Sequence, residues 1–423
     1  MERLYWNNDW KFAETWEEAM KEAVYPENEM EDVRLPHTCK ELPYHYFDEH
    51  AYQMLCGYRR HFMAPEAWQG KSVELTFEGV AHDAVVYVNG TEVKAHHCGY
   101  TAFFVELAKY LKYGEDNVLA VRVDSRENLN IPPFGYAIDY MTFGGMYREV
   151  YVQVRNKTHL ADVFIKPQIH PLQVTTEITV QNISDGITLQ QEIRKKGEGA
   201  YSPLGKKPVK QTNVQTVFPV QEIRLWELEN PYLYEIRTSL WKNGEMIDAR
   251  VDITGFREAG FRKDGFYLNG KKLRLRGLNR HQSYPYVGYA APASMQIFDA
   301  DILKKELGVN AVRTSHYPQS QDFIRRCDEI GLLVFTEFPG WQHIGDEEWK
   351  RQAVQNLKEM IVQYRNHPSI ILWGVRINES QDDDVFYRET NRVAHELDDT
   401  RATGGVRMLK KSHLLEVFIK TTI

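Results

Sequence analysis

The chain has 423 residues, 43% hydrophobic and 26% charged, which is enough for roughly two to four domains and excludes a disordered or collagen-like protein. Its 52 Lys and Arg against 59 Asp and Glu give a net charge of −7 without a basic block, which excludes a nucleic-acid partner. The N-terminus lacks an apolar signal-peptide core, the apolar runs are too short to cross a bilayer, and the four cysteines form no CxxC pair, so we expect a reduced, cytoplasmic protein without a membrane partner.

Residues 1–157 have the pattern of a β-sandwich. Apolar and polar side chains alternate over residues 72–77, as in a half-buried strand. Asn89-Gly90 follows the apolar run 84–88 and predicts a tight hairpin, because both residues tolerate positive φ. Further strands are predicted at 117–123 and 149–154. Many short strands joined by turns predict a jelly roll.

Residues 158–256 continue the β pattern and predict a smaller, immunoglobulin-like sandwich. The predicted strands are residues 174–180, 214–220 and 233–241. Asn243-Gly244 is a second hairpin signal. Residues 195–210 are rich in Gly, Lys and Pro and predict a solvated loop.

In residues 257–423 short apolar runs alternate with amphipathic helices. The predicted strands are 273–278, 310–313, 332–337 and 370–375, with a fifth starting near Thr403. The predicted helices are 295–307, 319–330, 347–365 and 385–397. Repeated βα units predict a parallel sheet, either a barrel or a doubly wound sheet. No Gly-rich phosphate loop follows a predicted strand, which disfavours nucleotide-binding folds.

Polar residues follow the ends of these predicted strands. They are Asn279-Arg280-His281, Arg313 with His316, Glu337 with Trp341 and His343, and Asn378-Glu379. In a βα barrel the carboxyl ends of the strands converge on one face, where active sites lie. We therefore expect these distant clusters to become neighbours.

Each of these residues also has a structural interpretation. Glu379 could satisfy the N-terminus of the following helix, and Asn378 could be a turn residue. His316 could be a buried turn histidine, and Arg313 could pair with Glu337 only structurally. His96-His97-Cys98 has metal-binding residue types, but adjacent residues point to opposite faces of a strand, so we interpret it as accidental.

Motifs over nearly the whole chain carry a family resemblance. The first two thirds contain Leu35-Pro36-His37, Tyr58-Arg59-Arg60, Val86-Tyr87-Val88-Asn89-Gly90, Gly99-Tyr100-Thr101-Ala102-Phe103, Gly144-Gly145-Met146-Tyr147-Arg148-Glu149-Val150 and Gly255-Phe256-Arg257. The last third contains Asn279-Arg280-His281, Arg313-Thr314-Ser315-His316-Tyr317-Pro318 and Trp373-Gly374-Val375-Arg376-Ile377-Asn378-Glu379. Together they resemble glycoside hydrolase family 2, the family of β-galactosidases, β-glucuronidases and β-mannosidases.

The resemblance implies a jelly roll (1–157), an immunoglobulin-like sandwich (158–256) and a (β/α)8 TIM-barrel domain (257–423). It implies that Glu379 is the general acid/base, that Asn378 contacts the sugar 2-hydroxyl, and that His316 and His343 line the sugar pocket. Asp139 would reach towards that pocket from the first domain. The run Asn-Arg-His-Gln with Tyr284-Pro285-Tyr286 looks more like the galactosidase branch than the glucuronidase branch.

A retaining glycosidase needs a second carboxylate as nucleophile, which in this family is a Glu near the end of a later barrel strand. The candidates after Glu379 are Asp382, Asp383, Asp384, Glu389, Glu396, Asp398, Asp399 and Glu416, and by their positions none fits. Eight βα units take about 250 residues, so we expect an incomplete barrel of four or five units in a C-terminally truncated chain that is inactive or impaired alone.

The resemblance implies a carbohydrate partner, a β-galactoside or a related glycoside. The sequence predicts no cofactor; a divalent cation such as Mg²⁺ is conceivable beside Glu379, but no other ligands are identifiable. The open half barrel should expose apolar faces and strand edges, so we expect a homo-oligomer. The alternatives are a β-glucuronidase or β-mannosidase, and a carbohydrate-binding or assembly module without catalysis.

Overall fold

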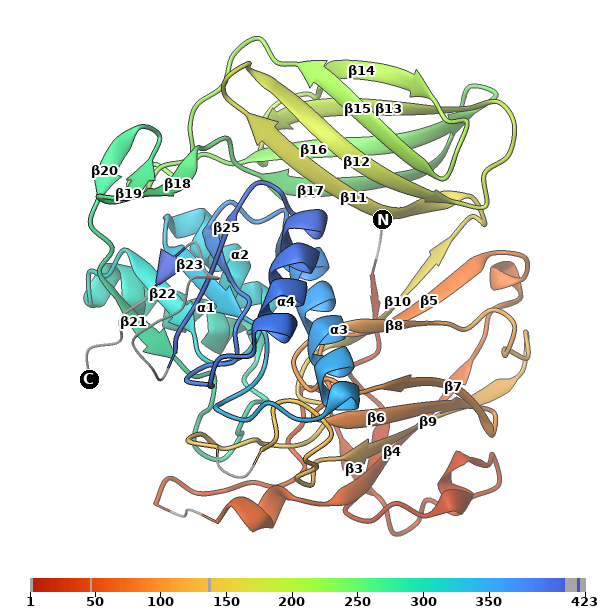
Figure 1. Cartoon of the computed structure of the whole chain (residues 1–423). Helices are drawn as coiled ribbons and strands as arrows, with labels where there is room; N and C mark the ends of the chain where they lie inside the picture. Colours follow the sequence, from red (N-terminus) through yellow and green to blue (C-terminus); the bar gives the residue numbers. More distant parts are fainter. Residues whose placement is uncertain (1–2, 46–47, 136–137, 408–416, 419–423) are drawn as a thin grey trace.

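The computed structural model describes residues 3–45, 48–135, 138–407 and 417–418. The chain forms two β-sandwiches followed by a parallel sheet with helices, as predicted (Figure 1). In Figure 1 the second sandwich lies above the helical part and the first lies beside it. Within the described ranges, no helix is long and apolar enough to cross a membrane.

The first sandwich packs a six-stranded antiparallel sheet against a four-stranded one. The larger sheet has the order β3 (Glu31–Val33), β2 (Trp10–Ala13), β4 (Leu55–Met63), β9 (Asp116–Asp124), β6 (Asp83–Val88), β7 (Thr91–His96). The smaller has the order β1 (Leu4–Tyr5), β10 (Val150–Arg155), β5 (Ser72–Phe77), β8 (Phe103–Glu106). Short 3₁₀ turns lie at Glu18–Lys21, Glu49–Tyr52 and Glu66–Trp68. Asn89 and Gly90, at φ of 51° and 83°, form the predicted hairpin turn between β6 and β7.

The second sandwich has the sheet order β11 (His159–Gln168), β12 (Gln173–Gln181), β15 (Asn213–Pro219) facing β14 (Ser202–Pro208), β13 (Ile187–Lys195), β16 (Tyr234–Lys242), β17 (Glu245–Thr254). The prediction of a loop at 195–210 was wrong in part, because β14 pairs with β13 there. β14 is an edge strand, where Pro, Gly and Lys are tolerated because one side of the backbone faces solvent.

A small sheet of β18 (Ala259–Arg262), β19 (Gly265–Leu268) and β20 (Lys271–Leu273) connects this sandwich to the parallel sheet. The single strand predicted at 273–278 is divided, because β20 ends at Leu273 and the parallel sheet begins with β21 (Gly277–Arg280). At Gly277 a Cβ would lie 2.5 Å from the carbonyl oxygen of Ala311, so only glycine allows β21 to approach its neighbour here.

The last part is a six-stranded parallel sheet in chain order, as expected of an incomplete barrel. After β21 come β22 (Ala311–Thr314), β23 (Leu333–Glu337), β24 (Ile370–Gly374), β25 (Ala402–Gly405) and β26 (Val417–Phe418). The helices are α1 (Ala293–Asp301), α2 (Gln321–Ile330), α3 (Glu347–Tyr364) and α4 (Asp384–Leu397). The helix predicted at 295–307 is α-helical only to Asp301 and continues as a π-helical turn, Ile302–Glu306.

Side chains on the two faces of the parallel sheet have different surroundings. Val334 and Trp373 pack with the helices in one core. Leu333, Phe335 and Leu372 face the other side, where they pack with residues of the β18–β20 sheet. Because side chains alternate along a strand, Glu337 at the end of β23 also points to this second, barrel-interior face.

Candidate functional site

A buried ion pair lies at the carboxyl ends of β22 and β23. Arg313 Nη2 donates to Glu337 Oε1 at 2.7 Å and Oε2 at 2.9 Å, and Arg313 Nε donates to Oε2 at 3.1 Å. Glu337 is 1% exposed and Arg313 is 6% exposed. Burial raises the pKa of Glu337, but the Arg313 charge and the hydrogen bond from His316 outweigh it and hold that pKa below its ordinary value. Glu337 is therefore a fixed anion.

His316 joins the same carboxylate. Its Nδ1 lies 2.7 Å from Glu337 Oε1. An ionised carboxylate only accepts hydrogen bonds, so Nδ1 carries a proton; in the neutral ring the Nε2 lone pair then faces a ligand. The structural role that the sequence left open for Arg313 is thus present, and the same ion pair also orients His316.

Asn378 lies next to this cluster, just beyond β24. Its Oδ1 accepts a hydrogen bond from Arg313 Nη2 at 2.7 Å, and its backbone carbonyl accepts one from the Gln342 N–H at 2.8 Å. Since the side-chain oxygen faces Arg313, the Asn378 amide nitrogen is presented as a donor on the opposite side of the group. The alternative of a simple turn residue does not account for this buried contact.

Glu379 is partly buried and has a φ of 53°. Its N–H donates to Val406 O at 3.0 Å, and its Oε2 accepts a long hydrogen bond of 3.4 Å from Gln342 Nε2. The N-cap of α4 is Asp383, whose side chain accepts from the Phe386 N–H at 3.0 Å. The helix-capping interpretation of Glu379 is therefore wrong.

Gln342 is a site residue that the sequence pattern does not reveal. It lies in the loop after β23 with a φ of 58° and bonds to both Asn378 and Glu379. Nothing in its local sequence indicates this backbone conformation, because the neighbouring loop after β24 holds it there through the bridge between Trp341 and Asn378.

The first sandwich contributes to the same face. Gly135 packs so closely on His343 that a Cβ at residue 135 would lie 2.4 Å from the His343 Cβ. The His343 ring also packs edge-on against Trp349 at 5.7 Å. Asp139 is exposed, and within the described residues no polar contact joins it to His316, His343, Asn378 or Glu379.

The neighbour of Asp139, Tyr140, makes the contact with the strand ends instead. Its ring lies 5.2 Å from that of His281 and 5.9 Å from that of His316. Burial lowers the pKa of His281 to about 4, so this ring is neutral near pH 7. The wall contributed by the first sandwich is thus aromatic.

The acidic residues after Glu379 are engaged elsewhere. Asp382 pairs with Arg376 at 2.7 Å and also with Arg407. Asp383 pairs with Lys350 at 2.9 Å and Asp398 with Arg401 at 2.6 Å. The remaining acids lie on α4 (Asp384, Glu389, Glu396), after it (Asp399) or, for Glu416, outside the described residues. None of these acidic residues, where the structure describes them, pairs with Arg313, Glu337, Asn378 or Glu379.

No group of three or more His, Cys, Asp or Glu able to hold a metal occurs in the part of the chain that the structure describes. In the His96-His97-Cys98 sequence, the two histidine side chains contact different partners. His96 Nε2 lies 3.1 Å from Glu359 Oε2 on α3, whereas His97 Nδ1 lies 2.7 Å from Asp83 Oδ1.

Comparison with known proteins places these parts in one family. Three family models of glycosyl hydrolases family 2 match the chain in succession: the sugar binding domain over residues 32–155, the family 2 domain over 158–257 and the TIM barrel domain over 260–420.

The chain is 48% identical over 421 residues to a β-galactosidase of Thermoanaerobacter pseudethanolicus and 46% identical over 426 residues to one of Thermoanaerobacterium thermosulfurigenes. These alignments cover 98% and 97% of this chain but 56% and 58% of the relatives. The chain therefore spans little more than half the length of these curated relatives.

Among solved structures, Bacteroides uniformis β-glucuronidase 2, covalently bound to cyclophellitol-6-carboxylate aziridine, matches with a TM-score of 0.87 at 28% identity. The match covers 96% of this chain and 52% of that one.

Proposed function

The chain belongs to glycoside hydrolase family 2, and we propose that its strand-end face is the acid/base half of a retaining β-galactosidase-type site. The observation that carries this proposal is the placement of Glu379 beside Asn378, with both residues held by Gln342. The relatives at 48% and 46% identity, both β-galactosidases, support a galactoside over a glucuronide.

In this proposal Glu379 protonates the leaving-group oxygen of a terminal β-D-galactoside. Asn378 donates to the 2-hydroxyl, because Arg313 holds its Oδ1. His316 accepts a hydrogen bond from a sugar hydroxyl through Nε2, and His343 lines the pocket. Asp139 is proposed as a further sugar contact from the first sandwich.

Retention requires a second carboxylate about 5–5.5 Å from the acid/base. Glu337 does not fill this role, because it is buried and both of its oxygens are bound by Arg313, with His316 also on Oε1. We therefore propose that the described chain carries no nucleophile and that it hydrolyses galactosides negligibly by itself.

The experiment is hydrolysis of 4-nitrophenyl β-D-galactoside by the chain and by Glu379→Gln. The proposal predicts equal, background rates for both proteins, since the covalent route is absent. Turnover by the chain that Glu379→Gln abolishes would show that the chain does hold a nucleophile and would overturn this part of the proposal.

The alternatives remain a β-glucuronidase or β-mannosidase and a carbohydrate-binding or assembly module.

We also propose self-association of the chain. An apolar cavity of about 950 Å³ opens between the β18–β20 sheet and the barrel-interior face of the parallel sheet. Leu278 in its lining is 48% exposed, and such surface favours association. Light scattering that shows a stable monomer would contradict it.

A further inference from the structure

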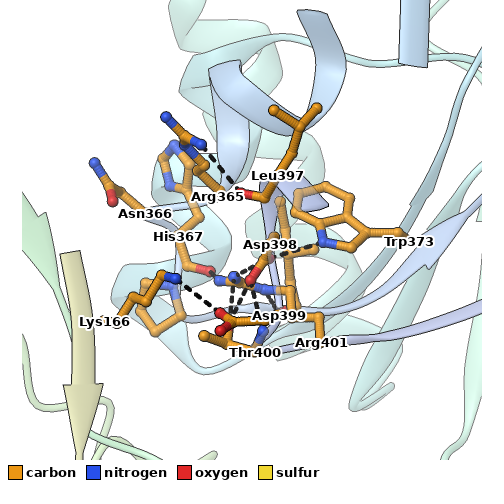
Figure 2. Close-up of polar contacts among 12 residues, drawn as sticks. Lys166, Arg365, Asn366, His367, Trp373, Leu397, Asp398, Asp399, Thr400 and Arg401 are labelled. Atoms are coloured by element: carbon orange, nitrogen blue, oxygen red, sulfur yellow. Dashed lines mark hydrogen bonds and ion pairs between the residues drawn. The ribbon is translucent and has the colours of Figure 1, made fainter. Parts of the chain in front are cut away.

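A second, polar cavity of about 660 Å³ lies between the second sandwich and the amino ends of β24 and β25. This is the opposite end of the parallel sheet from Glu379. β11, β12 and β15 line one side, and residues of β18–β19 and the loops before β24 and β25 line the other. Figure 2 shows part of this wall, with Lys166 of β11 reaching Asp399 and with Arg401 among Asp398, Thr400 and His367.

Five cationic side chains line the cavity: Lys166, Arg257, Arg262, Arg365 and Arg401. Three of them have carboxylate partners. Lys166 pairs with Glu177 and Asp399 at 2.6 and 2.8 Å, Arg401 pairs with Asp398 at 2.6 Å, and Arg365 pairs with Asp162. Within the described residues Arg257 and Arg262 have no such partner.

Arg257 is the unusual member of the set. Its Nε donates to the carbonyl of Pro368 and its Nη2 to that of Ile370, so both bonds go to uncharged backbone groups. Its Nη1 makes no hydrogen bond to any residue that the structure describes. Burial, followed by repulsion from Arg401, lowers the pKa of Arg257 to about 9. The charges of Asp398 and Asp328 partly offset this effect, but within the described residues no carboxylate makes ion-pair contact with Arg257, so its charge is only partly compensated.

We propose that this cavity binds a small oxyanion of the phosphate type, with Arg257 as its main ligand. A guanidinium offers paired N–H donors that match two oxygens of a tetrahedral anion. Arg262 is exposed at the cavity rim and would add a second charge. The carboxylates that oppose binding are Glu258, which also lines the cavity, the partly compensated Glu177 and Asp399, and Asp398 and Asp328, whose charges act on Arg257.

A sugar fits the cavity less well than an oxyanion. Among the described residues of its lining, Tyr267 is the one Phe, Tyr or Trp, and the guanidinium of Arg262 lies over that ring at 4.1 Å. The cavity therefore offers little aromatic surface for stacking on a sugar ring. The proposal is independent of the galactoside site, because it uses none of the strand-end residues.

An oxyanion held here would contact both the second sandwich and the parallel sheet, so its binding would stabilise their junction. The test is thermal unfolding and calorimetric titration with sodium phosphate at neutral pH, with sodium chloride used to keep the ionic strength constant. Sulfate and acetate form parallel arms that separate tetrahedral oxyanions from carboxylates.

We expect a saturable rise in the unfolding temperature with phosphate, and with sulfate more than with acetate. Arg257→Gln should abolish it, and Arg257→Lys, which keeps the charge without the paired donors, should weaken binding at least tenfold. Lys271→Gln on the exposed β20, whose side chain pairs with Glu227 at 3.5 Å, is the matched control and should leave it unchanged.

The Arg257 variants lose two backbone contacts and could fail to fold. In that event the test uses Arg262→Gln, at the exposed rim, which should weaken phosphate binding severalfold. An absence of saturable phosphate binding by the unmodified chain would overturn the proposal. Equal phosphate affinity in a folded Arg257→Gln variant would overturn it as well.

Discussion

His316 Nδ1 lies 2.7 Å from Glu337 Oε1, and the same oxygen accepts from Arg313 Nη2 at 2.7 Å. One buried carboxylate thus fixes the ring of His316 and the guanidinium that holds Asn378. The strand-end site is organised around an anion that touches no proposed reacting atom. Its effect on a ligand passes through the two groups that it orients.

The tautomer of His316 is the first testable consequence. Because Glu337 accepts from Nδ1, the neutral ring should be the Nδ1–H form with Nε2 unprotonated. Nitrogen-15 NMR of histidine-labelled chain would report this pattern, with His316→Gln used to assign the signal. A dominant Nε2–H tautomer at pH 7 would contradict the hydrogen-bond arrangement described here.

Removal of the Glu337 charge should destabilise the fold. Glu337→Gln leaves Arg313 buried without a countercharge, and breaking a buried pair in this way costs about 3–5 kcal/mol. Denaturant unfolding measures the change. Glu389→Gln, which removes an exposed partner of Arg392, is the control and should change the free energy of unfolding little. Equal effects from the two variants would contradict the role of the buried pair.

Glu78 should give the chain a pH dependence of stability. Burial raises the pKa of Glu78 to about 7, although Arg3, 3.3 Å away, lowers it in part. A folded-state pKa above the unfolded one means that the contribution of Glu78 is fully present below the unfolded pKa and is lost as the pH rises through about 7.

Glu78→Gln should therefore remove part of the fall in stability between about pH 5 and 8, by up to about 3 kcal/mol. Urea unfolding at both pH values measures this, with Glu92→Gln on the exposed face of β7 as the control. A steeper loss of stability with pH in Glu78→Gln than in the unmodified chain would show that the Arg3 pair dominates instead.

Much of the fold follows from sequence patterns. The alternation of apolar runs and amphipathic helices after Gly255 predicts β22 to β24 and α2 to α4 within a few residues. The sequence pattern predicts strands incorrectly where contacts with other strands determine whether a segment joins a sheet. β14 is a strand because β13 offers it an edge, and β20 and β21 are separate because the chain leaves one sheet and enters another.

The site is predictable in part for the same reason. Parallel strands bring their carboxyl ends together, so the convergence of Arg313, Glu337 and Asn378 follows from the βα pattern alone. Gln342 and Tyr140 do not follow from it. Gln342 depends on a loop conformation with positive φ, and Tyr140 depends on how the first sandwich docks against His316.

The most direct test of the proposed half-site is a calorimetric titration of galactose into the chain and into Asn378→Ala. The proposal predicts saturable binding of galactose in preference to glucuronic acid and mannose, and a loss of affinity of roughly five- to tenfold in Asn378→Ala, since a hydrogen bond to a sugar hydroxyl contributes about 1–1.5 kcal/mol. Gln352→Ala on α3 is the control. No heat with galactose, or equal affinity in Asn378→Ala, would contradict it.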